Sequence, residues 1–263
     1  MSVRVYKIGG PALEDRGLMA PLAHEVRRGS GPALLVHGGG RAVDRVLKAL
    51  GIESRFVDGR RDTSPAAMEI VEMVLSGMVN KALAAGLSAA GVPAVGISGR
   101  DAALLRARLE PNLGRVGLPE RVDPRVIDAL WAAGLVPVVS PVANGPLGEP
   151  VNVNADEAAL AIARALSAAT LVYLSDVDGV RVGDSTAETL TPAQAQARIE
   201  DGTIAGGMAL KVRVALAASA AGIPDVVIAG KARLLGGFAG TRIVAAAAAT
   251  QETDAPAARP ARR

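Results

Sequence analysis

Two lysines stand beside glycine pairs that lie far apart in the chain. Lys7 ends the first apolar run and precedes one pair, and Lys211 follows the other pair at the start of a helical stretch. Glycine lets backbone N–H groups approach a phosphate closely, and a helix N-terminus adds a favourable dipole. A lysine ammonium neutralises charge that builds up on a transferred phosphoryl group. This arrangement indicates a nucleotide triphosphate held against an acceptor.

A third glycine segment closes the second apolar run and reads His37-Gly38-Gly39-Gly40. We expect Gly10, Gly38 and Gly39 to give backbone N–H contacts to phosphates. His37 is interpreted as a small polar end of a strand without a catalytic role. No Ser and Asp accompany it in the pattern that a catalytic triad requires.

The composition excludes several classes of function. The 263 residues carry a net charge of only +3, so the pI of about 9.6 is no sign of a nucleic-acid surface, and runs of five like charges are absent. Without cysteine there is no disulfide framework and no cysteine metal site. We find neither a signal-peptide core nor ~18 uninterrupted apolar residues, so we expect a cytoplasmic protein without a membrane span.

Short β-branched runs alternate with helical segments rich in alanine and leucine, which favours βαβ units and a mainly parallel sheet. Aromatic residues are 2% of the chain, so the core must consist of Ala, Val, Leu and Ile. The strands are expected at 3–8, 33–37, 94–97, 136–140, 171–174 and 226–229. The helices are expected at 18–28, 41–50, 65–90, 124–133, 156–166, 192–201 and 208–221.

The remaining segments are expected to be less regular. Residues 104–123 are interpreted as irregular, with a small hairpin around 113–117, and residues 144–152 as a loop. The long helix 65–90 is a buried core helix or, alternatively, one that also crosses a subunit interface. Residues 250–263 have no periodic apolar face and are predicted to be disordered.

The ordered set of motifs resembles the amino acid kinase family, and within it the acetylglutamate kinases. The resemblance covers roughly residues 3–244. Any single glycine motif is weak evidence, whereas the complete series in this order is specific. The matching segments are Lys7-Ile8-Gly9-Gly10, His37-Gly38-Gly39-Gly40, Gly59-Arg60-Arg61-Asp62-Thr63, Glu72-Met73-Val74, Val79-Asn80-Lys81, Ser98-Gly99, Leu113-Gly114-Arg115-Val116-Gly117, Asn152-Val153-Asn154-Ala155-Asp156, Leu174-Ser175-Asp176-Val177-Asp178-Gly179-Val180 and Gly206-Gly207-Met208 with Lys211.

We therefore predict an α/β fold, a three-layer αβα sandwich with a central, mainly parallel sheet and two lobes. Residues 1–170 would form the lobe that binds the acyl-amino acid and dimerises, and residues 171–249 the lobe that binds ATP. The resemblance implies transfer of the γ-phosphoryl group of ATP to the side-chain carboxylate of N-acetyl-L-glutamate, a step of arginine biosynthesis. Magnesium would arrive with the nucleotide, because the sequence has no dedicated metal cage.

The resemblance also implies a role for each site residue. Lys7 and Lys211 would flank the migrating phosphoryl group, with Asp156 holding both ammonium groups. Asp156 need not act as a base, because the acceptor carboxylate is already ionised at neutral pH. The expected substrate-binding residues are Gly38, Gly39, Arg61, Asn152 and Asn154. The expected nucleotide-binding residues are Gly9, Gly10, Ser175, Asp176, Gly179, Val180, Gly206, Gly207 and Met208.

Within the substrate group, the two arginines that follow Gly59 have different expected roles. Arg61 occupies the position that grips the α-carboxylate in the family, and a guanidinium binds a carboxylate in a bidentate manner. Arg60 is predicted to be solvated. Asn152 and Asn154 would contact the N-acetyl amide and a carboxylate of the substrate.

Two segments depart from the family pattern. Ser98-Gly99 is followed by Arg100-Asp101-Ala102, where the last position is usually glycine, and the late strand reads Ile228-Ala229-Gly230-Lys231 in place of the usual Asp-Gly-Arg. These departures concern the substrate rim and the adenine pocket and leave the phosphoryl-transfer residues intact.

Two other functions are compatible with parts of the sequence. One is a kinase for carrier-protein-linked aminoadipate or glutamate in lysine biosynthesis, although residues 113–117 favour the free substrate. The other is a non-catalytic metabolite-binding module, which would require a damaged phosphate site. Arginine-inhibited hexameric members carry an extra N-terminal helix, and six residues precede Lys7 here. We therefore expect a homodimer that is insensitive to arginine.

Overall fold

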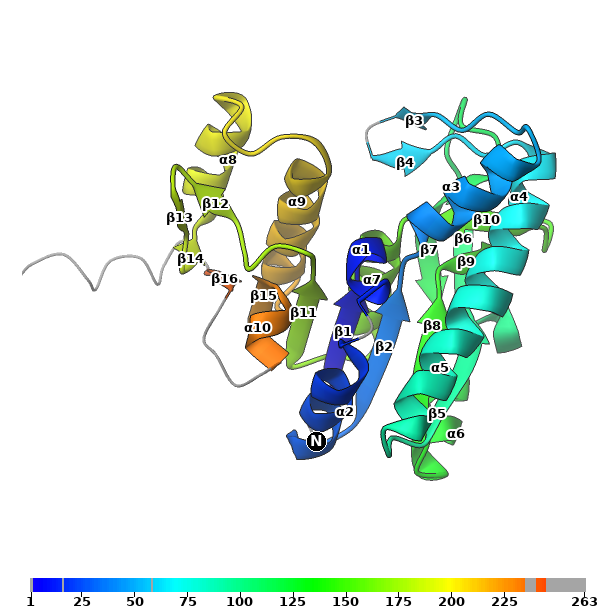
Figure 1. Cartoon of the computed structure of the whole chain (residues 1–263), viewed down its shortest axis with the longest axis horizontal. Helices are drawn as coiled ribbons and strands as arrows, with labels where there is room; N and C mark the ends of the chain where they lie inside the picture. The colour runs from blue at the N-terminus through cyan, green and yellow to red at the C-terminus, as the bar shows by residue number, and fades with distance from the viewer. Residues whose placement is uncertain (1, 16, 58, 235–239, 245–263) are drawn as a thin grey trace, which may run out of the picture.

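The computed structural model describes residues 2–15, 17–57, 59–234 and 240–244 (Figure 1). Within these residues, eight strands form a central sheet in the order β14-β16-β15-β11-β1-β2-β8-β5. Its strands are β1 (Arg4–Ile8), β2 (Ala33–His37), β5 (Ala94–Ser98), β8 (Val136–Ser140), β11 (Thr170–Leu174), β14 (Thr189–Leu190), β15 (Asp225–Ala229) and β16 (Thr241–Ile243). The strands from β15 to β5 are parallel, and β16 is antiparallel to β15.

The helices connect these strands and cover both faces of the sheet. They are α1 (Gly10–Leu13), α2 (Met19–Arg28), α3 (Gly40–Ala49), α4 (Pro65–Glu72), α5 (Asn80–Ala89), α6 (Arg125–Ala132), α7 (Ala155–Ala165), α8 (Pro192–Glu200), α9 (Gly206–Ala220) and α10 (Lys231–Leu234). The six predicted strands are confirmed to within one residue at each end, and the predicted helices are also present.

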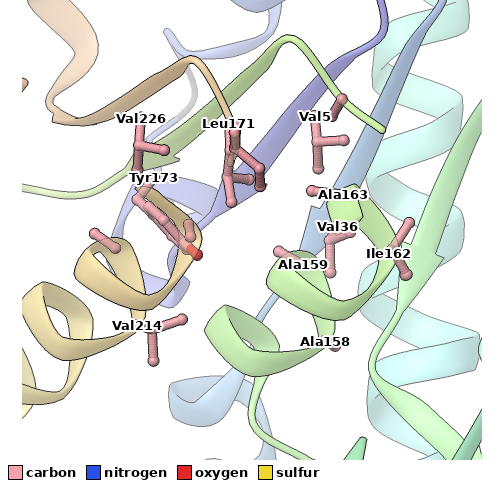
Figure 2. Packing of buried hydrophobic residues seen from close by; sticks show 14 of the residues in the cluster. Val5, Val36, Ala158, Ala159, Ile162, Ala163, Leu171, Tyr173, Val214 and Val226 are labelled. Atoms are coloured by element: carbon pink, nitrogen blue, oxygen red, sulfur yellow. The ribbon is translucent and has the colours of Figure 1, made fainter. Parts of the chain in front are cut away.

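Alternation along the central strands produces two apolar layers. Val5 of β1 packs with α7 and α9 on one face, and its neighbour Tyr6 packs with α2 and α5 on the other. Successive side chains of a strand point to opposite faces, so each face receives its own helical layer. Figure 2 shows the first layer, where Ala158 and Ala159 of α7 lie against the strands. The predicted three-layer αβα sandwich is confirmed.

The predicted long helix is continuous but changes its winding. Between α4 and α5, the segment Met73–Val79 (η1) forms π-helical turns. By length and composition, Pro65–Ala89 is apolar enough to cross a membrane, which alone is weak evidence. Asn80 lies fully buried in it and donates hydrogen bonds to the carbonyls of Ile97 and Val138, at 3.2 and 2.9 Å. These bonds attach the helix to β5 and β8, as expected for a core helix.

The two segments predicted to be irregular contribute to four strands that close into a small barrel. These strands are β6 (Leu105–Leu109), β7 (Val116–Val122), β9 (Val142–Asn144) and β10 (Pro150–Val153). The interpretation of 104–123 as irregular was therefore wrong, although the hairpin around 113–117 is present between β6 and β7. The loop predicted at 144–152 is shorter, because both of its ends pair in a hairpin. Strands this short give a weak sequence signal.

Among the described residues, two short two-stranded sheets lie outside the central sheet and the barrel. The pairs are β3 (Phe56–Val57) with β4 (Arg60–Arg61), and β12 (Arg181–Val182) with β13 (Ser185–Thr186). The division into lobes at residue 170 stays a prediction, since β11 begins there and pairs directly with β1 in one sheet. The predicted disordered tail, 250–263, lies outside the described residues.

The turn after β5 carries a conformational strain that can be tested. Ala102 and Ala103 have φ values of 50° and 53°, in the left-handed region that disfavours residues with a Cβ. We expect Ala102→Gly to raise the free energy of unfolding by about 0.5 to 1 kcal/mol, because the strain relieved exceeds the added chain entropy. Chemical denaturation monitored by circular dichroism measures this change.

The matched control is Ala85→Gly, at an exposed position inside α5. It should lower the free energy of unfolding by about 1 kcal/mol, because glycine disfavours a helix interior. If both substitutions destabilise the protein equally, the strain assigned to Ala102 is absent.

Candidate active site

Three charged side chains from three separate elements meet in the interior. Asp156 of α7 lies between Lys7 of β1 and Lys211 of α9. The Nζ atom of Lys7 is 2.8 Å from Asp156 Oδ1, and the Nζ atom of Lys211 is 3.3 Å from the same oxygen. All three residues are less than a tenth exposed. One buried carboxylate is thus shared by two ammonium groups.

Local structure explains why the Asp156 carboxylate is available to the lysines. Asn154 is the N-cap of α7, and its side-chain oxygen accepts hydrogen bonds from the backbone N–H groups of Asp156 and Glu157 at 2.8 and 3.4 Å. A cap of this kind satisfies the first turn of a helix. Asp156 is therefore not needed as the cap of α7, and its carboxylate is available to the two lysines.

Burial and the charges within the cluster shift the pKa values of Asp156 and Lys211. Burial by itself would raise the pKa of Asp156, but the adjacent Lys7 and Lys211 charges outweigh burial and lower this pKa, so the carboxylate is ionised. Burial, together with repulsion from Lys7, lowers the pKa of Lys211 to about 8, although Asp156 acts in the opposite direction. The cluster carries two positive charges against one negative charge, so an anion such as a phosphate is favoured beside it.

A cavity of about 190 Å³ opens beside Lys7 and Asp156. Sites for drug-sized ligands have volumes of about 300–1,000 Å³, so this one suits a small metabolite. The predicted substrate residues Gly38, Gly39, Arg61, Asn152 and Asn154 all line it. Residues far apart in sequence are therefore brought to the same cavity.

Arg61 extends from β4 and is almost fully buried at the cavity wall. Its guanidinium donates to Asp44 at 2.5 Å, to the Ser54 hydroxyl and to the Gly40 carbonyl at 3.1 Å, and lies over the Phe56 ring. These contacts use three of the five N–H donors of a guanidinium, so two are left for a carboxylate. The neighbouring contacts fix the orientation of the group.

The prediction that Arg60 is solvated is wrong. Its side chain is 22% exposed and forms an ion pair with Glu157, with 2.5 Å between Nη2 and Oε1. Because consecutive strand residues point to opposite sides, Arg60 faces α7 while Arg61 faces α3. The pair attaches the β3–β4 hairpin to the helix that carries Asp156.

Both predicted asparagines also hold the frame of the cavity. The Asn152 amide donates to the Thr63 hydroxyl at 3.1 Å, and the Asn154 amide donates to the Gly59 carbonyl at 3.4 Å. With its oxygen capping α7, Asn154 has one amide N–H left for a ligand. Contact of these two residues with a substrate stays a prediction.

The glycine loops contribute differently from what we expected. The Gly38 N–H donates to the Ile8 carbonyl at 2.9 Å, and the Gly9 N–H donates to the Leu174 carbonyl at 2.9 Å. The ladder of the parallel sheet extends one residue past each strand and occupies these donors. In this structure the Gly38 N–H is used by the sheet, and contact of Gly38 with a phosphate stays a prediction.

The next residues form the N-terminus of α3 and line the cavity. The first N–H groups of a helix have no acceptor within it. Gly39 is the N-cap of α3 at φ 155°, and an added Cβ would lie 2.7 Å from Leu75 of the π-helical segment. Gly40, which the residue-level prediction omitted, also lines the cavity. The sequence carried a signal for Gly40, because it is the third glycine of the segment that begins at His37.

The predicted nucleotide-binding residues lie after the carboxyl ends of β1 and β11 and at the N-terminus of α9. Gly10 begins α1, directly after β1. Ser175 and Asp176 follow β11 and line a second cavity of about 210 Å³, together with Asp15 and Lys231. Gly206, Gly207 and Met208 form the first turn of α9, the helix that carries Lys211. Nucleotide contact by these residues stays a prediction.

Gly179 and Val180 are placed to anchor the loop after β11. Val180 is fully buried, its N–H donates to the Thr241 hydroxyl oxygen at 2.8 Å, and its carbonyl accepts from the Ala187 N–H. A Cβ added at Gly179 would lie 2.6 Å from Thr186. Neither polar backbone group of Val180 is open to a ligand, so we assign it to positioning the loop.

Two observations concern metal binding and His37. Among the described residues, no group of three or more His, Cys, Asp or Glu side chains could hold a metal ion. His37 is fully buried, and its Nε2 lies 3.0 Å from the Asn80 amide nitrogen. Burial lowers the pKa of His37 to about 4, so the ring is neutral and structural at physiological pH.

The sequence interpretation missed several residues around the cavity. Asp44 forms an ion pair with Arg61, and Phe56 covers the guanidinium of Arg61. The Thr63 hydroxyl accepts a hydrogen bond from the Asn152 amide. Only Asp44 had a usable signal, as an acid one turn into the helix that follows the glycine loop. A larger cavity of about 610 Å³ lies on the other side of Gly39, with mainly apolar walls. The smaller cavity is the candidate active site, because Lys7 and Asp156 of the charged cluster line it.

The fold and this site define the class of the protein. The sequence pattern of the amino acid kinase family matches residues 2–230, and the chain belongs to that family. Within it, the chain groups with the acetylglutamate kinases. The acetylglutamate kinase of Rubrobacter xylanophilus is 44% identical over 92% of this chain and 96% of its own length, and that of Bacillus velezensis is 41% identical over 91% and 95%.

Solved structures share the fold of this chain. The smu.665 protein of Streptococcus mutans UA159 superposes with a TM-score of 0.81 at 27% identity, covering 92% of this chain and 98% of its own. An N-acetylglutamate synthase of Neisseria gonorrhoeae, complexed with coenzyme A and N-acetyl-glutamate, has a TM-score of 0.78 at 27% identity, and the match covers 92% of this chain and 59% of the synthase. A carbamate kinase of Giardia lamblia, at 15% identity and TM-score 0.67, shares the fold.

The charge of Lys211 predicts a pH dependence. Because burial and Lys7 lower its pKa to about 8, the free enzyme loses this ammonium above that pH. We expect kcat/KM for MgATP to fall above about pH 8, since this ratio reports titration in the free enzyme. A steady-state pH profile measures the fall.

Lys211→Arg is the control, because a guanidinium stays charged over the whole range. Its overall rate will be lower, but its profile should stay level well above pH 8. A wild-type profile that is level up to pH 10 would contradict the assignment of Lys211.

Proposed function

We propose that this protein is an acetylglutamate kinase that transfers the γ-phosphoryl group of ATP to the side-chain carboxylate of N-acetyl-L-glutamate. The observation that carries the proposal is the buried Lys7–Asp156–Lys211 cluster beside a small cavity lined by Arg61. Identity of 41–44% with acetylglutamate kinases over nearly the whole chain supports the choice of substrate. The products would be an acyl phosphate and ADP, in arginine biosynthesis.

The residues act by position and charge. Arg61 holds the α-carboxylate of the substrate, so that the other carboxylate reaches toward Lys7. Lys7 and Lys211 stabilise the charge on the phosphoryl group as it passes between oxygens, and Asp156 keeps both ammonium groups in place. Reactions of this kind depend mainly on alignment and electrostatic stabilisation. No base is required, since the attacking carboxylate is ionised at neutral pH.

In this proposal the nucleotide binds at the carboxyl ends of β1 and β11, beside the substrate cavity. Its phosphates lie near Gly10 and the N-terminus of α9, where Gly206 and Gly207 leave room for close approach. Parallel sheets bind ligands at the carboxyl ends of their strands, and β1 and β11 are paired neighbours there. Magnesium comes with ATP and neutralises part of its charge. Residues 171–249 would form this nucleotide lobe.

We further propose a cytoplasmic homodimer. Met73 and Met78 of the long helix are 61% and 47% exposed, and β5 is an edge strand of the central sheet. Apolar side chains beside an open strand edge are typical of a face that another subunit covers. Light scattering measures the mass, and a monomer or a hexamer would refute this state.

The activity itself is tested by two readouts on the purified protein with MgATP. Release of ADP should require N-acetyl-L-glutamate, and added hydroxylamine should trap the acyl phosphate as a hydroxamate. Lys7→Ala and Lys211→Ala should each lower kcat by about 10²- to 10³-fold, because each removes one group that stabilises the transition state.

Three outcomes would contradict the proposal. One is ADP release without hydroxamate, which would indicate simple ATP hydrolysis. Another is turnover of carrier-linked aminoadipate or glutamate in place of the free substrate. The third is full activity of Lys211→Ala, since the proposal places this ammonium at the transferred group.

The assignment of Arg61 predicts a selective effect on one substrate. Arg61→Lys keeps a positive charge but loses the planar pair of donors. We expect KM for N-acetyl-L-glutamate to rise about tenfold or more, while KM for MgATP changes less than about twofold. Arg60→Lys is the matched control at the adjacent position. An equal rise in both KM values for Arg61→Lys would place this arginine outside the substrate site.

A further inference from the structure

Tyr173 is a buried aromatic residue directly beneath the charged cluster. It lies on β11 opposite Lys7 in the parallel register, so both side chains project from the same face of the sheet. In Figure 2 its ring lies between α9, which carries Val214, and α7, which carries Ala158 and Ala159. Tyr173 is fully buried, in a chain with two tyrosines, two phenylalanines and one tryptophan.

The ring of Tyr173 faces the ammonium group of Lys211. The Nζ atom lies 5.9 Å from the ring centroid. At such distances the negative face of an aromatic ring attracts a cation, and the attraction is stronger where water is excluded. Both groups are in the interior, so the contact is of the stronger kind.

The hydroxyl of Tyr173 contributes less than the ring. Among the described residues it has no hydrogen-bond partner, although it is buried. Burial, together with the negative charge of Asp156, raises the pKa of this hydroxyl well above its usual range, so it stays neutral. An unpaired buried hydroxyl lowers stability. The ring, which contacts the Lys211 ammonium, is therefore the part of Tyr173 that can favour the site.

The charge balance around the Lys211 ammonium explains what an aromatic ring adds to the cluster. Three groups face the Lys211 ammonium: Lys7 from β1, Asp156 from α7 and Tyr173 from β11. Two ammonium groups share one carboxylate, and a second carboxylate would repel the phosphates of the nucleotide. An aromatic face stabilises a cation without adding a net negative charge.

We propose that Tyr173 is a positioning residue for phosphoryl transfer, whose ring face keeps the Lys211 ammonium charged and directed toward the transferred group. The catalytic part of this inference rests on the proposed function. The effect on Lys211 itself does not, because it exists in the free protein.

The first experiment needs no activity. Lysine Cε and Nζ nuclei are labelled, Lys211 is assigned through Lys211→Arg, and the free protein is titrated by NMR as wild type, Tyr173→Phe and Tyr173→Leu. Tyr173→Phe keeps the ring and should titrate like the wild type. Tyr173→Leu removes the ring, and the protonation constant of Lys211 should fall about threefold.

A second variant series avoids any change of packing. Phenylalanine analogues with one, two and three ring fluorines are placed at position 173, which weakens the negative face stepwise at nearly constant shape. The protonation constant of Lys211 should fall progressively along the series. If Tyr173→Leu fails to fold, this series still gives the answer, and no trend along it would overturn the proposal.

Kinetics then test the catalytic part. In Tyr173→Leu the fall of kcat/KM at high pH should begin at lower pH than in the wild type, and Tyr173→Phe should match the wild type. If Tyr173→Phe is as impaired as Tyr173→Leu, the hydroxyl and not the ring is the important group, and the proposal is wrong. If the titrations behave as expected but no N-acetyl-L-glutamate is phosphorylated, only the proposed function fails.

Discussion

A single carboxylate shared by two buried ammonium groups is the interaction on which this site depends. Burying charges costs free energy unless they are paired, and removing one partner leaves the other uncompensated. Asp156 balances one of the two charges of Lys7 and Lys211, at 2.8 and 3.3 Å. The remaining positive charge favours an anion, and in the proposed function the phosphates of the nucleotide supply it. The fold thus holds a charge arrangement that a polyphosphate completes.

The rest of the molecule serves to bring these three side chains together. Lys7 is fixed by β1 in the middle of the sheet, and Asp156 and Lys211 are on helices that pack on the same face. Where α7 and α9 cover the sheet they present alanines such as Ala159 and Ala215, which permit close packing. A core poor in aromatic residues is consistent with this geometry, and in this layer the buried aromatic residue Tyr173 lies under the cluster.

Much of this arrangement could be predicted from the sequence, because its signals are local. Strands that end in Lys7-Ile8-Gly9-Gly10 or His37-Gly38-Gly39-Gly40 are visible as apolar runs closed by glycine. The small barrel was not predictable, since its short strands pair with partners distant in the chain. Nor was the pairing of Arg60 with Glu157, 97 positions later, or the use of the Gly38 N–H by the sheet. These depend on tertiary neighbours that a sequence pattern does not contain.

The central claim is that Lys7 and Lys211 act on the transferred group more than on the bound nucleotide. Calorimetry can compare the affinity for MgADP with the affinity for MgADP, aluminium fluoride and N-acetyl-L-glutamate together, which imitates phosphoryl transfer. In Lys7→Met and Lys211→Met, the account predicts a loss of about 100-fold or more for the transition-state mimic and less than about tenfold for MgADP. Equal losses for both ligands would contradict it.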